Sequence, residues 1–182
     1  MEQLCRLLKP LANLYTILII WVLTSLNFYL CFKPLLDYAT AASLQTLPVV
    51  LDALTYYTAD EGYEVLSILG DQGRQAYRLV NYADFVLPIL LFLSLSLPHV
   101  AMGTNNRWIV FPLAYMLSDY MENIAEKYVL EIYPSRNDFV MTLASSIGFI
   151  KLVTFAGSIL VLTINGLIWI WPSKSSNKRK TK

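Results

Sequence analysis

Polar side chains recur at helical spacing inside an otherwise apolar stretch of the chain. They occupy positions i, i+3, i+4 and i+7, and so share one helix face: Asp119, Glu122, Asn123 and Glu126. If a membrane-spanning helix starts at Trp108, a rise of about 1.5 Å per residue puts Asp119 about 16 Å into the bilayer. Because an ionised group there costs about 2.5–3.5 kcal/mol on insertion scales, this face must meet a bundle interior, a wet cavity or a partner charge.

Lys151 is a partner charge for this face. If a second helix starts at Thr142, Lys151 lies about 13 Å along it, which is the depth of Glu122 counted back from Leu130. We therefore predict that Lys151 pairs with Glu122 or Asp119. Two interpretations stay open. The pair could fix helix packing without any chemistry, or the two acids could act as acid–base groups or bind a cation.

Further candidate ligand-binding residues precede the second apolar stretch. They are Arg74, Tyr77, Arg78 and Asp84, to which Asn123 on the acidic face is added. Arg74 and Arg78 are four residues apart, so they share a helix face and could hold a phosphate near the bilayer surface. The alternative is that both arginines pair with carboxylates of their own loop.

The composition excludes several classes of protein. The 182 residues are 56% hydrophobic and only 15% charged, whereas a soluble domain has about 25% charged residues. One histidine, His99, cannot build a His-based metal site, and Cys5 and Cys31 form no CxxC motif. We therefore expect no metal, no cofactor and no nucleic-acid partner. The expected partners are the lipid bilayer and either a membrane protein or a lipid ligand.

Long apolar stretches predict an all-α membrane protein, a four-helix bundle in a single domain of residues 1–172. The spans are expected at residues 11–32, 85–102, 108–130 and 142–171. Lys33 and Pro34 are expected to end the first span. The alternative for that span is a signal peptide, and the alternative for the third is a shallow interfacial helix, which would leave three spans.

Basic residues set the expected orientation. Arg6, Lys9, Arg107 and the basic tail of residues 173–182 flank the spans on one side, which places both termini in the cytosol. Residues 33–84 then form an exoplasmic loop.

Helix punctuation in that loop predicts two or three short helices. Thr58 and Glu61 have the spacing of a capping box, and Gly70 can end a helix. These helices would form a lid over the bundle.

The tail also contains Lys178 and Lys180, which are the fifth and third residues from the C-terminal end, as in the dilysine signal that retrieves membrane proteins to the endoplasmic reticulum. We therefore expect residence in that membrane. The alternative is an ordinary solvated tail, or one that contacts anionic lipid.

Several short strings resemble a family of small, functionally uncharacterised four-span membrane proteins. They are Gly62-Tyr63, Leu69-Gly70-x-x-Gly73-Arg74-x-x-Tyr77, Asp84 with Pro88, and Asp119-x-x-Glu122-Asn123. The resemblance covers about residues 62–151. It implies a four-helix membrane bundle and no particular activity.

For function, we expect a non-enzymatic scaffold, assembly subunit or lipid-binding factor. The alternative is an enzyme or transporter that acts on a lipid or small amphiphile through Asp119 and Glu122. A pocket lined by these acids together with Asn123 and Arg74 would favour the alternative, whereas Lys151 filling that space would favour the scaffold.

Overall fold

Every regular element in residues 1–170 of the computed structural model is a helix, which confirms the predicted all-α class. The structure describes those residues, apart from the side chain of Asn106. In chain order the elements are α1 (Glu2–Leu8), η1 (Lys9–Leu11), α2 (Leu14–Ala41), η2 (Leu51–Ala53), α3 (Ala59–Asp84), α4 (Leu87–Ala101), η3 (Asn106–Ile109), α5 (Val110–Ile132) and α6 (Asp138–Ile170). The basic tail with Lys178 and Lys180 lies outside the described residues.

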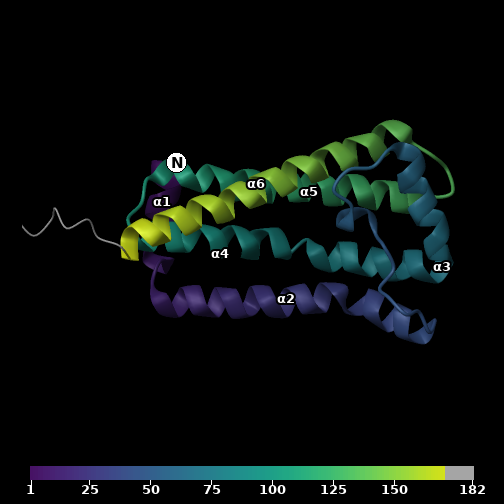
Figure 1. Ribbon diagram of the computed structural model, residues 1–182, viewed down its shortest axis with the longest axis horizontal. Coiled ribbons are helices and arrows are strands. Elements are labelled where there is room, and N and C mark those ends of the chain that lie inside the picture. The colour runs from purple at the N-terminus through teal and green to yellow at the C-terminus, as the bar shows by residue number, and fades with distance from the viewer. Residues whose placement is uncertain (171–182) are drawn as a thin grey trace, which may run out of the picture.

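Four helices, α2, α4, α5 and α6, run side by side along the long axis (Figure 1). α5 and α6 form a closely packed hairpin, and α2 packs on α3 and α4. α3 leads into α4 with a bend of 41° and, together with the 42–58 segment, covers one end of the bundle. The N-terminus and the end of α6 lie at the opposite end (Figure 1).

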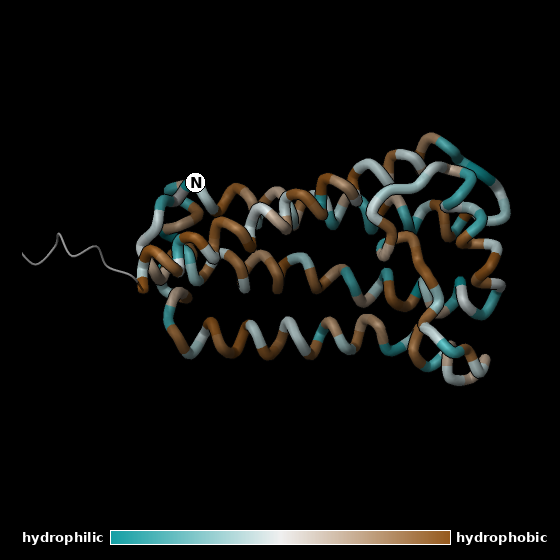
Figure 2. The backbone as a smooth tube through the Cα atoms, viewed as in Figure 1, coloured by the Kyte–Doolittle hydropathy of each residue, from teal (hydrophilic) through white to brown (hydrophobic). Residues whose placement is uncertain are grey.

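Two helices, α2 and α6, are long and apolar enough to cross a membrane, and the bent pair α3 and α4 would count as a third if it forms one span. Hydrophobic residues dominate the middle of the bundle, whereas hydrophilic residues concentrate towards its two ends (Figure 2). Many large apolar side chains point outward, among them Val22, Leu160 and Leu167. A water-exposed surface of this kind would be unfavourable, so these helices fit a lipid environment.

α2 continues past the position where we expected it to end. The prediction that Lys33 and Pro34 stop this helix is wrong, because the helix runs to Ala41. A proline inside a helix removes one N–H donor and crowds the carbonyl four residues earlier, so packing of the following turn must offset that cost. Lys33 Nζ lies 2.5 Å from Asp37 Oδ2 at spacing i, i+4, and Leu35 is fully buried against α3.

The predicted loop of residues 33–84 is therefore largely helical. Its last 26 residues form α3, which starts with the expected capping box: Thr58 accepts from the N–H of Glu61, and Glu61 accepts from the N–H of Thr58. Gly70 interrupts α3 with a φ of 62° and ψ of −177°, a conformation that glycine adopts without a Cβ penalty. The expected helix break is thus present, as a kink.

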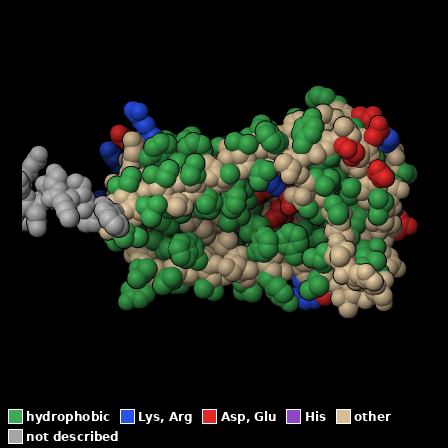
Figure 3. Space-filling view, in the orientation of Figure 1, with side chains coloured by type: hydrophobic (Ala, Val, Ile, Leu, Met, Phe, Trp, Pro, Cys, Tyr) green, Lys and Arg blue, Asp and Glu red, His purple; other side chains and the backbone are tan. Residues whose placement is uncertain are grey.

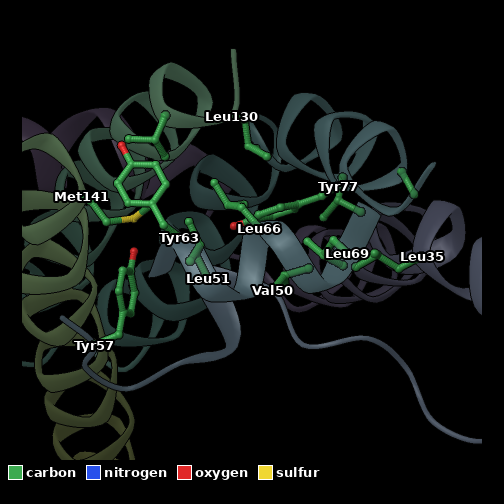
Figure 4. Close-up of a cluster of buried hydrophobic side chains, with 13 residues drawn as sticks. Leu35, Val50, Leu51, Tyr57, Tyr63, Leu66, Leu69, Tyr77, Leu130 and Met141 are labelled. Carbon is green, nitrogen blue, oxygen red and sulfur yellow. The ribbon is translucent and has the colours of Figure 1, made fainter. Parts of the chain in front are cut away.

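A hydrophobic cluster fixes α3 and the preceding segment to the bundle (Figure 4). Its buried members are Leu35, Val50, Leu51, Tyr57, Tyr63, Leu66, Leu69, Ala76, Tyr77, Val80, Val129, Leu130 and Met141. These side chains come from α2, α3, α5, α6 and the 48–57 segment. The cluster therefore sets the position of that short irregular segment, which reaches into the bundle next to the polar face of α5.

Prolines in α4 leave backbone acceptors that neighbouring helices satisfy. Pro98 has no N–H to donate to the carbonyl of Ser94, and the indole N–H of Trp21 donates to that oxygen at 3.1 Å instead. At the break before α4, the hydroxyl of Tyr120 donates to the carbonyl of Phe85 at 2.9 Å. These contacts hold α4 between α2 and α5 despite its irregular backbone.

Candidate functional site

Lys151 lies at the centre of a buried ionic cluster. Its Nζ is 2.5 Å from Glu122 Oε2 and 3.6 Å from Asp119 Oδ1, and it also contacts Asp52 Oδ1. The lysine side chain is 16% exposed. Both partners expected from sequence are thus within ion-pair distance, and the structure adds a third acid from the segment between α2 and α3.

The sequence did not indicate Asp52 as a partner of Lys151, because no periodic spacing links Asp52 to the acids of α5. Its neighbour Leu51 is completely buried in the hydrophobic cluster, and its own backbone N–H donates to the hydroxyl of Tyr77 at 3.3 Å. These contacts direct the carboxylate at Lys151. One signal could have identified it: an aspartate that stands inside an apolar run, residues 48–54, is a candidate for a buried, paired acid.

The polar face of α5 points inward along its whole length. Asp119, Glu122, Asn123 and Glu126 are all buried. The Tyr115 hydroxyl donates to Asp119 Oδ2 at 2.7 Å, one turn away on the same helix. The helical spacing therefore places the acids as expected.

Asp84, Asn123 and Tyr77 are held by contacts between helices. The amide of Asn123 donates to Asp84 Oδ2 at 2.9 Å, and its backbone carbonyl accepts from Asn81 at 3.1 Å. Tyr77 is buried and donates to Glu126 Oε2 at 2.8 Å. Asp84 ends α3 and does not cap α4.

Arg74 and Arg78 lie away from the buried acidic face of α5, although Arg78 Nε is 3.8 Å from Glu131 Oε2 near the C-terminal end of that helix. Arg74 contacts Asp71, donates to the carbonyl of Leu66 at 2.7 Å and lies 4.2 Å from the centre of the Tyr133 ring. Arg78 donates to the carbonyl of Leu130 at 2.8 Å. These contacts tie α3 to the ends of α5, so both arginines have protein partners of their own.

A cavity of about 280 Å³ lies beside the ionic cluster. Its ionisable lining consists of Asp52, Asp84, Asp119, Glu122 and Lys151, together with Cys31 and Tyr115. Its aromatic and aliphatic lining includes Phe28, Phe32, Leu87, Leu91, Leu152 and Phe155. In Figure 3 acidic and basic side chains are visible in a hollow surrounded by hydrophobic ones.

This cavity differs in part from the pocket considered in the sequence analysis. Asp119 and Glu122 line it, whereas Asn123 and Arg74 do not. Lys151 forms part of the wall and leaves space in front of it. Because Phe28 and Leu152 on its border are about half exposed, the cavity opens on the side of the bundle, between α2 and α6.

Negative charge exceeds positive charge in this region. Two groups of three acids have carboxylate oxygens within 4.8 Å of one another: Asp52, Asp84 and Asp119, and Asp52, Glu122 and Glu126. Among these acids, Asp119 Oδ1, Glu122 Oε2 and Glu126 Oε1 accept no hydrogen bond, although Glu122 Oε2 is ion-paired with Lys151. Burying uncompensated charge is unfavourable, so protons or a bound cation must neutralise the carboxylates that Lys151 does not neutralise. Carboxylate oxygens are ligands for hard cations, although we expected no metal from the sequence.

Comparison with known proteins adds no constraint: no family model, curated protein or solved structure matches this chain. The resemblance to four-span membrane proteins stays a prediction.

We predict that Lys151→Met strongly destabilises the protein. Removing one partner of a buried ion pair leaves unpaired charge and typically costs about 3–5 kcal/mol. The measurement is the thermal unfolding midpoint in detergent, together with the yield of folded protein. Lys33→Met is the matched control, because its pair with Asp37 is half exposed and worth about 1 kcal/mol at most. Adding Glu122→Gln to Lys151→Met should restore part of the loss, and a fully stable Lys151→Met protein would contradict the role of the cluster.

We also predict that Gly148→Ala weakens the α5–α6 hairpin. A Cβ at position 148 would overlap Glu122 Oε1, so either the carboxylate leaves Lys151 or the helices separate. Overpacking of this kind costs about 1–3 kcal/mol. Gly166→Ala, on the same helix with nothing within 4 Å, should cost nothing. In a double-mutant cycle with Glu122→Ala the penalty should shrink, and an unchanged penalty would refute this explanation.

Proposed function

We propose that this chain is a four-span membrane protein that binds an amphiphilic molecule in the cavity beside Lys151, as a non-enzymatic lipid-binding factor. The observation that carries the proposal is a cavity that combines an apolar, half-exposed border with an acidic interior. A polar group could reach the acids while an apolar chain extends between α2 and α6 into the surrounding lipid.

The distribution of side chains on α5 supports four spans. Its acids are buried, whereas its outward positions are apolar and 45–59% exposed: Leu117, Met121, Ile124 and Tyr128. This arrangement, polar inside and apolar outside, suits a helix in lipid. The 23 residues of α5 extend about 34 Å, enough for a hydrocarbon core of about 30 Å.

Basic residues support the orientation with both termini in the cytosol. Arg6, Lys9 and Arg107 line a single groove formed by α1, η1, η3 and the end of α4. The last described turn of α6 lies at the same end of the bundle. Lysine and arginine near span ends favour the cytosolic side. Residence in the endoplasmic reticulum rests on Lys178 and Lys180 in the sequence alone.

A topology experiment tests the four spans. In a background without native cysteines, we expect Thr46→Cys and Ser135→Cys to react with a membrane-impermeant maleimide on one side, and Gln3→Cys on the other. All three positions are exposed. If α5 were a shallow interfacial helix, Ser135→Cys would react on the same side as Gln3→Cys, and the four-span proposal would fail.

A second experiment tests ligand binding. We expect wild-type protein in mild detergent to retain a defined amphiphile, detected by native mass spectrometry, and Leu91→Trp to lose it because the indole fills the cavity. Ile89→Trp adds the same bulk to the outer face of α4 and should retain the amphiphile.

Other outcomes would favour other functions. An amphiphile released in chemically altered form would support the alternative of an enzyme acting through Asp119 and Glu122. Equal lipid content in all three proteins, with a stoichiometric protein partner, would instead support a scaffold or assembly subunit.

A further inference from the structure

We infer that the polar group received by this cavity is a protonated amine, held by Asp84 and Asp119. The inference rests on the proposed function and names the chemical class of the ligand. It follows from the charge of the walls, from the hydrogen-bonding state of these two acids and from the aromatic lining.

The walls of the cavity favour a cation. Lys151 is the one basic side chain among the described residues that line it, against four acids. That lysine is already engaged with Asp52 and with Glu122 Oε2 at 2.5 Å. Its distance to Asp119 Oδ1 is 3.6 Å, longer than a hydrogen bond, and Asp84 has a neutral partner, the amide of Asn123. Within the described part of the chain, Asp84 therefore has no cation of its own, and Asp119 shares Lys151 with two closer acids. A second cation suits these two acids, whereas an anionic head group would be repelled.

The acceptors are arranged for a small cation with several donors. Asp52, Asp84 and Asp119 each contribute one carboxylate oxygen to a group within 4.8 Å. Asp119 is 2% exposed and lines the cavity, yet its Oδ1 accepts no hydrogen bond. An alkylammonium group has three N–H donors and could satisfy such oxygens through charge-assisted hydrogen bonds.

Aromatic side chains surround the path to these acids. Phe28, Phe32, Tyr115 and Phe155 line the cavity. Aromatic faces attract ammonium groups by cation–π interaction, and the aliphatic residues between them suit an alkyl chain. Mg²⁺ and Ca²⁺ need six or more oxygen ligands, waters included, which this largely apolar lining supplies poorly. The cavity thus fits an amine with an apolar chain better than a metal ion.

Binding of three amphiphiles with the same chain tests the inference. The full-length protein in phosphatidylcholine nanodiscs is titrated with dodecylamine, dodecanol and dodecyl sulfate, and the shift of the unfolding midpoint is measured. We expect dodecylamine to bind most tightly and dodecyl sulfate least. Asp84→Asn and Asp119→Asn should each weaken amine binding at least about tenfold while affecting dodecanol little. Glu64→Gln, which removes an exposed carboxylate outside the cavity, should leave amine binding unchanged.

The other outcomes are distinct. Equal binding of all three amphiphiles, blocked by Leu91→Trp, would overturn the amine and leave the proposed function standing. Absence of any binding would overturn both. Stabilisation by Ca²⁺ or Mg²⁺ that is reversed by EDTA and lost in Asp119→Asn, without an effect of the amine, would show a metal site instead. If either Asn variant fails to fold, the order of binding of the three amphiphiles to the wild-type protein still tests whether the ligand is an amine.

Discussion

A single buried ammonium group joins parts of the chain that are far apart in sequence. Lys151 on α6 contacts Glu122 and Asp119 on α5 and Asp52 in the segment between α2 and α3. In an apolar interior these ionised side chains are stable only when they are paired, because an unpaired charge loses its hydration without a compensating interaction. The close packing of α5 on α6, which needs a residue without a side chain at Gly148, keeps Glu122 at this lysine. The position of Lys151 Nζ therefore constrains α5, α6 and the segment between α2 and α3 at the same time.

This constraint also explains why α5 is polar on its inner face and apolar on its outer face. Since the ionisable side chains of α5 must meet Lys151 and one another, the helix turns its apolar residues outward, where α2 and α6 are apolar as well. The acids exceed the one lysine in number, so those next to the cavity need protons or a bound cation. A structural ion pair and the proposed binding site are thus compatible: Glu122 and Asp52 lie closest to the lysine, and the ligand is proposed to bind Asp84 and the Oδ1 atom of Asp119.

Local rules anticipated the helices and part of the site. The all-α class followed from apolar length, the capping box at Thr58 from a three-residue spacing, and the proximity of Lys151 to Glu122 from equal depth along two helices. The predicted end of α2 was wrong because we expected Pro34 to stop the helix, whereas the packing of the following turn continues it. Asp52 was missed because its place depends on the burial of Leu51, a tertiary contact. The cavity could not be predicted, since its walls come from side-chain packing among five helices, α2 to α6, and the 52–55 segment.

The order of these residues along the chain has a consequence for biosynthesis. Asp119 and Glu122 precede Lys151 in the chain, so α5 leaves the ribosome before its counter-charge does. If α5 crosses the membrane as proposed, its insertion alone would be marginal, and it gains its partner only when α6 arrives. The short connection between Ile132 and Asp138 keeps the two helices together during that interval. The hairpin would then insert as one unit, and truncation before position 151 would leave α5 unstable in the membrane.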